Sequence, residues 1–420
     1  MSQVSTPSPA VADKPAGIAQ PLGAGAITAL VGFTSSFAVV LSGLRAVGAT
    51  PAQAASGLLV LCFTQGIGIL LLSFRYRIPI TLAWSTPGAA LLASTGLVAG
   101  GWPGAVAAFA VTGVLIVITG LWQRLGSLVA AIPVPIAQAM LAGVLLPLCL
   151  APVQALRTSP AVVVPVILVW LVLQRFAPKW AVLVAFATAA VGTGIDIAVN
   201  SKYLDLSAMV PTVELTVPQW HWQAIIGIAI PLYIVTMASQ NIPGVAVMRS
   251  FDFQIPWRPA MLVTGVGTIV GAAAGGHAIN LAAISAALAA APTASPDPKR
   301  RWIAAATAGA AYLILGLASA ALVTLIAAAP AGTIETVAGL ALLATLAAAL
   351  TGALTDPTHR MAALVTFLVA AAGTTLFGIG GAFWALIAGL VVRRVLPPAP
   401  DHPTPDDKVI DPINTVEKGR

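Results

Sequence analysis

The chain has 420 residues, of which 59% are hydrophobic and 8% are charged, and its formal net charge is +7. Soluble domains carry about 25% charged residues, so this composition excludes an ordinary soluble protein and indicates an integral membrane protein. Because the basic residues lie between long apolar runs, we interpret them as signals of membrane topology and expect no nucleic-acid partner.

The chain divides into two halves of alternating apolar and polar stretches. A transmembrane helix needs about 20 apolar residues. Breaking the sequence at charges, prolines and glycine clusters gives 14 candidate segments between two Pro-rich tails, which we expect to be disordered. The resulting order is a tail at 1–21, a first repeat at 22–197, a periplasmic linker at 198–221, a second repeat at 222–396 and a tail at 397–420. The segments of the first repeat are 24–47, 51–74, 84–99, 103–122, 133–151, 160–176 and 179–197. Those of the second repeat are 222–247, 259–275, 277–291, 302–328, 334–354, 359–377 and 380–395.

The distribution of basic residues supports this count. With the amino terminus in the cytoplasm, all but three of the 20 lysines and arginines fall on the cytoplasmic side. The three on the outer side are Arg45, Arg157 and Lys202. Because cytoplasmic loops are enriched in Lys and Arg, the asymmetry predicts a multi-pass protein of a bacterial inner membrane with both termini cytoplasmic. A twelve-helix transporter with two long membrane-buried loops is the alternative, and it gives the same termini.

An odd number of segments in each half makes the second half enter the membrane from the opposite side. This arrangement is an inverted-topology repeat. We therefore predict an all-α polytopic fold built as a 7+7 inverted repeat, in which the third segment of each half is too short to cross the membrane alone.

The short segment of the first half carries local signals for an extended stretch followed by a helix. Residues 78–82 read as extended backbone, Ser85 or Thr86 can cap a helix, and Pro87 fits its first turn. In the second half, paired glycines at 275–276 separate the ninth segment from a helix that we expect to begin near His277. Irregular backbone at membrane depth is tolerated where it is buried in protein or lines a cavity. The two helix starts therefore predict a cavity.

The predicted geometry also specifies a class of ligand. Two half-helices that enter from opposite faces bring both amino termini toward the middle of the bilayer, and such termini bind anions. No Lys, Arg, Asp or Glu lies in the middle of any predicted segment. We expect the two helix ends and neighbouring side-chain donors to hold a carboxylate without a buried arginine.

Several motifs at these positions resemble a known family. They are "GFTSSFAVVL" (32–41), "WSTPGAALLAS" (84–94), "PLYIVTMASQNIPGVAVMRSF" (231–251) and "GGHAINLAAISAALAAAP" (275–292), the last followed by "SPDPKRRWIAA" (295–305). The chain is similar to the BenE-type benzoate:proton symporters of bacterial inner membranes over roughly residues 22–395.

The resemblance implies the fold of uracil permeases and sulfate permeases. That fold splits into a core domain, here 22–122 and 222–328, and a gate domain, here 123–197 and 329–396. Its substrate lies between segments 3 and 10, flanked by segments 1 and 8. Uracil permeases carry buried carboxylates on segments 8 and 10, where this chain has amides and the turn that contains His277. This departure argues against a nucleobase and for an anion.

The candidate substrate site combines the two helix starts with the polar positions of segments 1 and 8. His277 is the predicted proton carrier, with a helix cap bonded to a backbone carbonyl as its alternative. For the amides the alternative is a hydrogen bond between helices, and for the aromatic rings it is ordinary packing. The predicted substrate-binding residues are Thr34, Ser36, Phe37, Ser85, Thr86, Pro87, Gly88, Tyr233, Gln240, Asn241, Gly276, His277, Ala278, Ile279 and Asn280.

These observations lead to a functional hypothesis. We expect a secondary transporter that imports benzoate or a related aromatic monocarboxylate together with a proton. We expect no cofactor and no enzyme activity, because the sequence has no Walker motif and no metal-ligand cluster. The alternatives are an anion uniporter or channel like the sulfate permeases and a nucleobase:proton symporter. Whether the protein forms a homodimer stays open.

Overall fold

The computed structural model describes residues 17–201 and 206–396. The predicted tail at 397–420 and most of the tail at 1–21 lie outside the described residues. Each of the 14 predicted segments contains at least one helix. Among the described residues, seven helices are long and apolar enough to cross a membrane, or eight if one bent pair counts as a single span. The number of spans therefore stays a prediction.

The first half of the chain folds into nine α-helices, one short strand and one 3-10 turn within the described residues. They are α1 (Ala19–Thr34), α2 (Phe37–Ala46), α3 (Pro51–Tyr76), β1 (Leu82–Trp84), α4 (Thr86–Thr95), α5 (Gly101–Leu121), α6 (Gln123–Ala130), α7 (Val134–Ala155), α8 (Pro160–Phe176), η1 (Pro178–Trp180) and α9 (Ala181–Val199).

The second half has the second strand and two π-helical turns, η3 and η4, within one long helical segment. Its elements are η2 (Leu206–Met209), α10 (Trp222–Ala224), η3 (Ile225–Ala229), α11 (Ile230–Thr236), η4 (Met237–Asn241), α12 (Ile242–Ser250), α13 (Trp257–Ala272), β2 (Ile279–Leu281), α14 (Ile284–Ala290), η5 (Pro298–Arg300), α15 (Trp302–Gly316), α16 (Ser319–Ala328), α17 (Thr333–Leu354), η6 (Pro357–His359), α18 (Arg360–Ala372) and α19 (Gly381–Val395).

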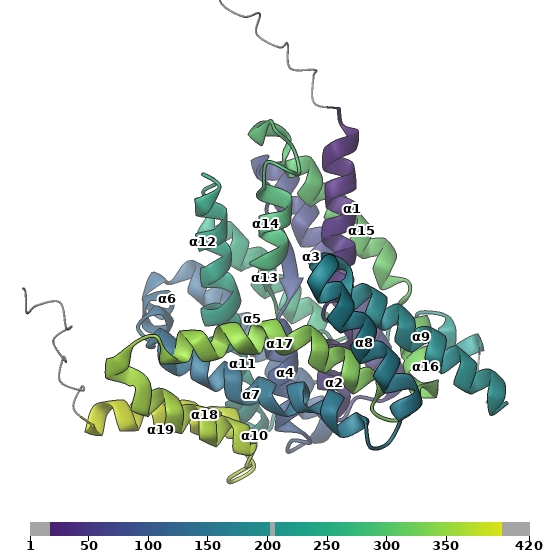
Figure 1. The fold of residues 1–420 in the computed structure, drawn as a ribbon. Coiled ribbons are helices and arrows are strands. Elements are labelled where there is room, and N and C mark those ends of the chain that lie inside the picture. Colours follow the sequence, from purple (N-terminus) through teal and green to yellow (C-terminus); the bar gives the residue numbers. More distant parts are fainter. Residues whose placement is uncertain (1–16, 202–205, 397–420) are drawn as a thin grey trace, which may run out of the picture.

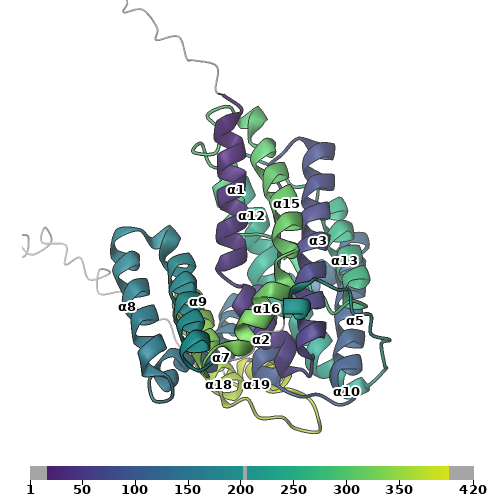
Figure 2. The ribbon, with the colours of Figure 1, turned by 90° about the vertical axis from the view of Figure 1, so that its right-hand side faces the viewer.

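The helices form two main groups. Helices α1, α3, α13 and α15 run in nearly the same direction, with α5 against α13 (Figures 1 and 2). Helices α7, α17, α18 and α19 pack on one another and run across the lower part of Figure 1. Helices α8 and α9 pair at one side of the molecule, as Figure 2 shows.

The contacts between the halves follow the predicted inverted repeat. Segment 2 of the first half (α3) packs on segment 11 (α15), and its counterpart, segment 9 (α13), packs on segment 4 (α5). Likewise α1 contacts α14, and α11 contacts α4. Each of these contacts thus has an equivalent with the roles of the halves exchanged.

Glycines show the same symmetry at the level of single residues. A Cβ atom at Gly66 of α3 would lie 2.8 Å from the carbonyl oxygen of Gly309 in α15. A Cβ atom at Gly113 of α5 would lie 2.8 Å from the carbonyl oxygen of Gly265 in α13. Small residues let helix backbones approach closely in membrane proteins. These two glycine pairs therefore bring the two halves into direct backbone contact.

Two predicted segments bend where the sequence suggested continuous helices. Segment 1 divides into α1 and α2 at Ser35 and Ser36. Segment 11 bends by 52° between α15 and α16. Pro243 and Gly244 in the sequence predict a break in segment 8, and this prediction is wrong, because the helix runs on to Ser250 through the π-helical turn η4. A π turn shifts the hydrogen-bond ladder by one residue, which lets the helix accommodate a proline that cannot donate.

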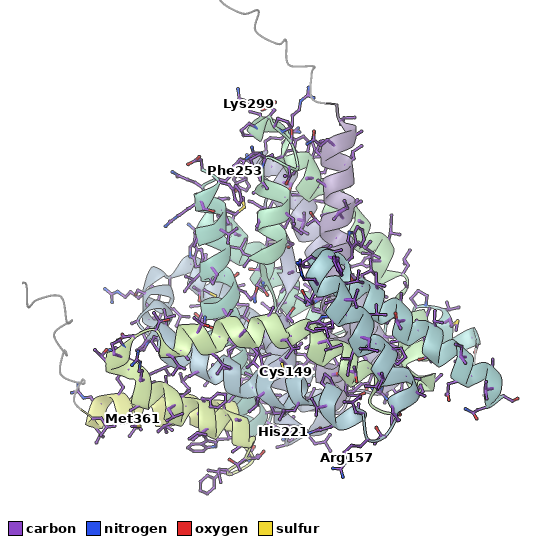
Figure 3. The ribbon with its side chains drawn as sticks, in the orientation of Figure 1. Cys149, Arg157, His221, Phe253, Lys299 and Met361 are labelled. Atoms are coloured by element: carbon purple, nitrogen blue, oxygen red, sulfur yellow. The ribbon has the colours of Figure 1, made fainter. Side chains whose placement is uncertain are left out.

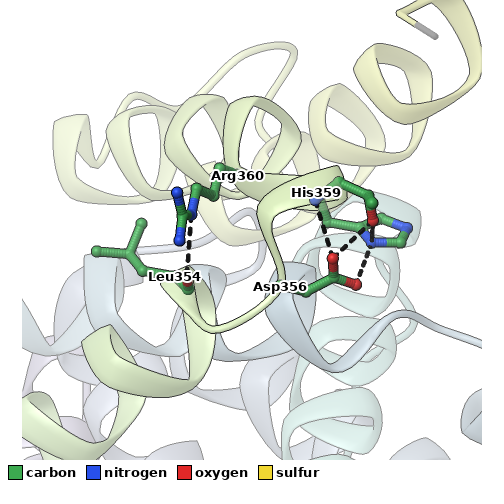
Figure 4. A network of polar contacts seen from close by, with 5 residues as sticks. Leu354, Asp356, His359 and Arg360 are labelled. Carbon is green, nitrogen blue, oxygen red and sulfur yellow. Dashed lines mark hydrogen bonds and ion pairs between the residues drawn. The ribbon is translucent and has the colours of Figure 1, made fainter. Parts of the chain in front are cut away.

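The loop between α17 and α18 is stabilised by an aspartate. Asp356 accepts hydrogen bonds from the backbone N–H of Thr358 at 2.9 Å and from His359 Nδ1 at 2.7 Å, while Arg360 Nε donates to the carbonyl oxygen of Leu354 (Figure 4). The hydrogen bonds from Thr358 and His359 lower the pKa of Asp356 from 3.8 to about 2. Asp356 therefore caps the short turn η6, which leads into α18.

Lys299 and Arg157 lie at opposite ends of the molecule (Figure 3). The sequence places Lys299 on the cytoplasmic side and Arg157 on the outer side. The direction of insertion stays a prediction.

Candidate functional site

The two short segments meet in the middle of the fold. Strand β1 pairs antiparallel with β2, with Leu82 opposite Leu281 and Trp84 opposite Ile279. The pairing continues beyond β1, because the N–H of Ser85 donates to the carbonyl oxygen of Ala278 at 2.8 Å. Helices α4 and α14 therefore start from opposite ends of one small strand pair, as expected for two half-helices that enter from opposite faces.

The start of α4 matches the local sequence signals. Ser85 is the N-cap, and its Oγ accepts a hydrogen bond from the N–H of Gly88 at 3.1 Å. Pro87 occupies the first turn and has no N–H. The N–H of Thr86 makes no hydrogen bond within the described chain. The amino terminus of α4 therefore offers one free amide, at Thr86.

The predicted start of α14 near His277 is wrong, since the helix begins at Ile284. The chain before it stays extended because side chains from two other elements accept its amide hydrogens. Thr268 Oγ1 of α13 accepts from the N–H of Ile279 at 3.1 Å, and Asn241 Oδ1 of η4 accepts from the N–H of Leu281 at 2.8 Å. These amides are thus already bonded within the protein.

His277 and Asn280 lie in this extended stretch and are fully buried. The Nδ1 atom of His277 lies 3.1 Å from the carbonyl oxygen of Ala278, an acceptor, so Nδ1 carries a hydrogen. Asn280 Nδ2 donates to the carbonyl oxygen of Leu281 at 2.8 Å. His277 Nε2 and Asn280 Oδ1 have no hydrogen-bond partner among the described residues. Each side chain therefore keeps one unused polar atom beside the strand pair.

A central cavity of about 150 Å³ lies beside the strand pair. Its wall combines the break between α1 and α2, the starts of α4 and α14, η4, α15 and α17, and none of the residues around it is a Lys, Arg, His, Asp or Glu. The residues are Val31, Gly32, Ser35, Ser36, Ala83, Trp84, Thr86, Pro87, Gln240, Ala282, Ala283, Ser285, Leu288, Tyr312, Ala341, Leu342 and Thr345.

Several polar groups of the central cavity are free to bind a ligand. The side chains of Thr86, Gln240, Tyr312 and Thr345 make no hydrogen bond to any described residue. They come from four different elements, α4, η4, α15 and α17. Because these groups line the cavity and have no partner in the described part of the chain, they can form hydrogen bonds with a ligand that carries polar atoms.

The apolar part of the wall contains ordered aromatic rings. The indole Nε1 of Trp84 donates to Ser36 Oγ at 2.9 Å, which fixes the ring. The ring of Tyr312 meets that of Trp84 edge to face at 6.1 Å between centroids. Phe33 packs behind Trp84 and stacks on Phe37 at 5.4 Å. Trp84 and Tyr312 thus present aromatic surface to the central cavity.

Other predicted residues support the site from outside the cavity wall. Asn241 braces β2 through the hydrogen bond to Leu281, and Thr236 Oγ1 donates to Ser85 Oγ at 2.8 Å. The hydroxyl of Tyr233 is paired with Thr119 Oγ1, away from the cavity.

The structure places four of the predicted substrate-binding residues on the wall of the central cavity. These are Ser36, Thr86, Pro87 and Gln240. Tyr312 and Thr345 also line it, although each lies within an apolar run of its helix and gave no sequence signal. The predicted residues that do not line this cavity are Thr34, Phe37, Ser85, Gly88, Tyr233, Asn241, Gly276, His277, Ala278, Ile279 and Asn280.

Comparison with known proteins now decides the family. The family described as "Benzoate membrane transport protein" matches residues 18–395. The chain belongs to this family. A relative named "Benzoate membrane transport protein" from Acinetobacter baylyi is 29% identical over 332 residues, 78% of this chain and 82% of that protein. The "Inner membrane protein YdcO" of Escherichia coli is 39% identical over 373 residues, 89% of this chain and 95% of that protein.

Solved structures support the fold. The transmembrane domain of the cyanobacterial bicarbonate transporter BicA matches with a TM-score of 0.58 and 16% identity, over 88% of this chain and 97% of that one. The murine anion transporter Slc26a9 in its inward-facing state matches with a TM-score of 0.58 and 13% identity, over 89% of this chain and 67% of that one. At such low identity the likeness concerns the fold alone. The family match makes the chain a membrane transporter, and the structural likeness gives it the 7+7 inverted-repeat architecture.

Proposed function

We propose that this protein imports benzoate or a related aromatic monocarboxylate across the bacterial inner membrane together with a proton. The observation that carries the proposal is the central cavity, where aromatic rings and uncharged hydrogen-bond donors surround about 150 Å³ of space. An engineered apolar cavity of about 150 Å³ binds benzene, so the volume suits a single aromatic ring. The names of the family and of the two relatives support the substrate class and the location.

The carboxylate is assigned to the start of α4. Thr86 brings a free N–H and an unpaired hydroxyl to the cavity wall, and the positive end of the α4 dipole lies there. Such a dipole contributes about 0.3–1 kcal/mol, and about 2 kcal/mol when partly buried. Gln240 adds an amide donor on the opposite repeat. In this assignment, uncharged hydrogen-bond donors bind the carboxylate without a cationic side chain, which agrees with the absence of charged residues from the wall of the central cavity.

The aromatic ring is assigned to the surface formed by Trp84 and Tyr312. Edge-to-face and offset aromatic contacts contribute about 0.5–1.5 kcal/mol beyond the burial of area. Because Trp84 is held by Ser36, and Phe33 packs behind it, this wall is ordered before the ligand binds. A preformed wall lowers the entropy cost of binding.

Proton coupling supplies the driving force in this proposal. A carboxylate with a pKa near 4 is an anion at neutral pH. Its inward movement against an inside-negative potential costs about 2.3 kcal/mol per 100 mV, and one accompanying proton removes that cost. His277 is our candidate carrier because its free Nε2 lies beside the strand pair, and its Nδ1 bonds the same Ala278 carbonyl that accepts from Ser85. His277 and the cap residue of α4, Ser85, thus bond to one shared carbonyl oxygen.

Movement between two domains is part of the proposal. We assign the core to residues 22–122 and 222–328 and the gate to residues 123–197 and 329–396. Most of the cavity wall comes from the core, whereas Ala341, Leu342 and Thr345 come from gate helix α17. A cavity between two bodies is opened to alternate sides when one moves against the other.

Uptake by proteoliposomes tests the function. We expect accumulation of labelled benzoate that is driven by an inward proton gradient and inhibited by salicylate but not by uracil or sulfate. Uptake that ignores a collapsed pH gradient would instead support an anion uniporter, and inhibition by uracil would support a nucleobase symporter. His277→Ala should abolish uptake or its pH dependence at unchanged expression, and wild-type behaviour of this variant would remove His277 from the mechanism.

A further inference from the structure

A second, larger cavity lies on the seam between α2 and α17. We call it the outer cavity; its volume is about 540 Å³, and its wall includes Ser42 and Arg45 of α2, Leu148 of α7, and Gly332 and Glu335 at the start of α17. Arg45 and Arg157 are both on the predicted outer side. The outer cavity therefore faces the side from which an imported substrate arrives.

Both cavities are lined by α17, and they lie toward the two ends of α2, whose N-cap is Ser36. Ser36 lines the central cavity and Arg45 lines the outer cavity. On α17, Thr345 lines the central cavity and Glu335 lines the outer cavity. At 1.5 Å per helical residue these separations correspond to about 14–15 Å along both helices. The outer cavity thus follows the central cavity along the interface between α2 and α17.

The charges of the two cavities differ. The central cavity has no Lys, Arg, Asp or Glu in its wall, whereas the outer cavity has Arg45 and Glu335, both exposed. Neither makes an ion pair with any described residue. Glu335 lies in the first turn of α17, where the helix dipole stabilises its charge. Arg45 therefore carries the guanidinium that is free for an incoming anion.

We infer that the outer cavity is a capture site, in which the Arg45 guanidinium binds the carboxylate of the substrate before it reaches the central cavity. This inference rests on the proposed function. A guanidinium binds a carboxylate through charge-assisted hydrogen bonds, and an exposed charge raises the local concentration of an oppositely charged substrate. Glu335 on the facing wall repels the same carboxylate and thereby limits how tightly it is held.

The test compares variants at two ionic strengths. Uptake of labelled benzoate is measured in proteoliposomes at about 0.01 M and about 0.15 M sodium chloride, where the Debye length is about 30 Å and about 8 Å. For Arg45→Gln we expect a KM about fivefold higher at low salt, a maximal rate within about twofold of wild type, and loss of the salt dependence of KM. Arg45→Lys should keep that dependence, and Glu335→Gln should lower KM.

Arg157→Gln is the matched control. Arg157 lies in the loop after α7 on the predicted outer side and does not line the outer cavity (Figure 3). Its KM should change by less than about twofold. Equal effects of Arg45→Gln and Arg157→Gln would overturn the capture site, as would a rise of KM in Glu335→Gln, which indicates a structural ion pair. Absence of benzoate uptake by the wild type would overturn the proposed function itself, and with it this inference.

Discussion

The hydrogen bond between Thr268 and β2 gives the sharpest test of how the site is held together. Thr268 and Thr264 are both fully buried in α13, one turn apart. Each hydroxyl donates to the carbonyl oxygen four residues before it. Thr268 Oγ1 also accepts from the N–H of Ile279 at 3.1 Å. The substitutions Thr268→Val and Thr264→Val therefore differ mainly in whether β2 loses an acceptor.

The expected magnitude follows from the fate of the Ile279 amide. A buried donor left without a partner costs about 1–3 kcal/mol, whereas a hydroxyl bonded back to its own helix contributes little. We expect Thr268→Val to lower the free energy of unfolding by about 1–3 kcal/mol more than Thr264→Val. Reversible unfolding in mixed detergent and SDS micelles measures both variants.

The same pair of variants links stability to function. A loosened β2 should raise the KM for benzoate in Thr268→Val, because β2 pairs with β1, whose Ala83 and Trp84 line the central cavity. Equal stability and equal KM in the two variants would refute the view that Thr268 holds the strand pair in place.

Three further predictions concern other parts of the molecule. Thr86→Val should raise the KM for benzoate about tenfold, as expected for loss of a hydrogen bond to a charged group. Thr95→Val, on the same helix but away from the cavity, should leave that KM unchanged. Uptake kinetics measure both variants, and similar KM values would contradict the assignment of the carboxylate to the start of α4. Gly66→Ala should destabilise the fold by about 1–3 kcal/mol through overpacking, whereas Gly194→Ala, with nothing within 4 Å of its Cβ position, should not, as measured by unfolding. Asp356 has a pKa lowered from 3.8 to about 2, so its contribution to stability is complete above pH 3.8 and is lost as the pH falls through about 2. The difference in melting temperature between wild type and Asp356→Asn should therefore shrink as the pH falls from 3.8 to about 2. A difference that does not depend on pH would contradict this role of Asp356.

Local signals in the sequence were sufficient for the first short segment. Ser85 and Pro87 act within the turn that they start, so their capping roles follow from neighbouring residues alone. The paired glycines at 275–276 correctly marked the end of α13 but not the start of α14. The intervening stretch is extended because Thr268 and Asn241 accept its amides, and contacts so distant in sequence leave no local pattern.

The composition of the cavity wall was also beyond the reach of local patterns. Tyr312 and Thr345 lie in apolar helices, and only tertiary packing turns them toward the central cavity. The same packing buries His277 and Asn280 without placing them on the wall of the cavity. The polar motifs therefore located the crossing of segments 3 and 10, but not each residue that faces a ligand.

Filling the central cavity tests the proposed site most directly. Ala341 of α17 lines the cavity, whereas Ala344 on the same helix is exposed. Calorimetric titration of purified protein with benzoate should show binding to the wild type and to Ala344→Phe, but none to Ala341→Phe at a similar melting temperature. Undiminished binding of benzoate to a folded Ala341→Phe variant would contradict the assignment of the ligand to this cavity.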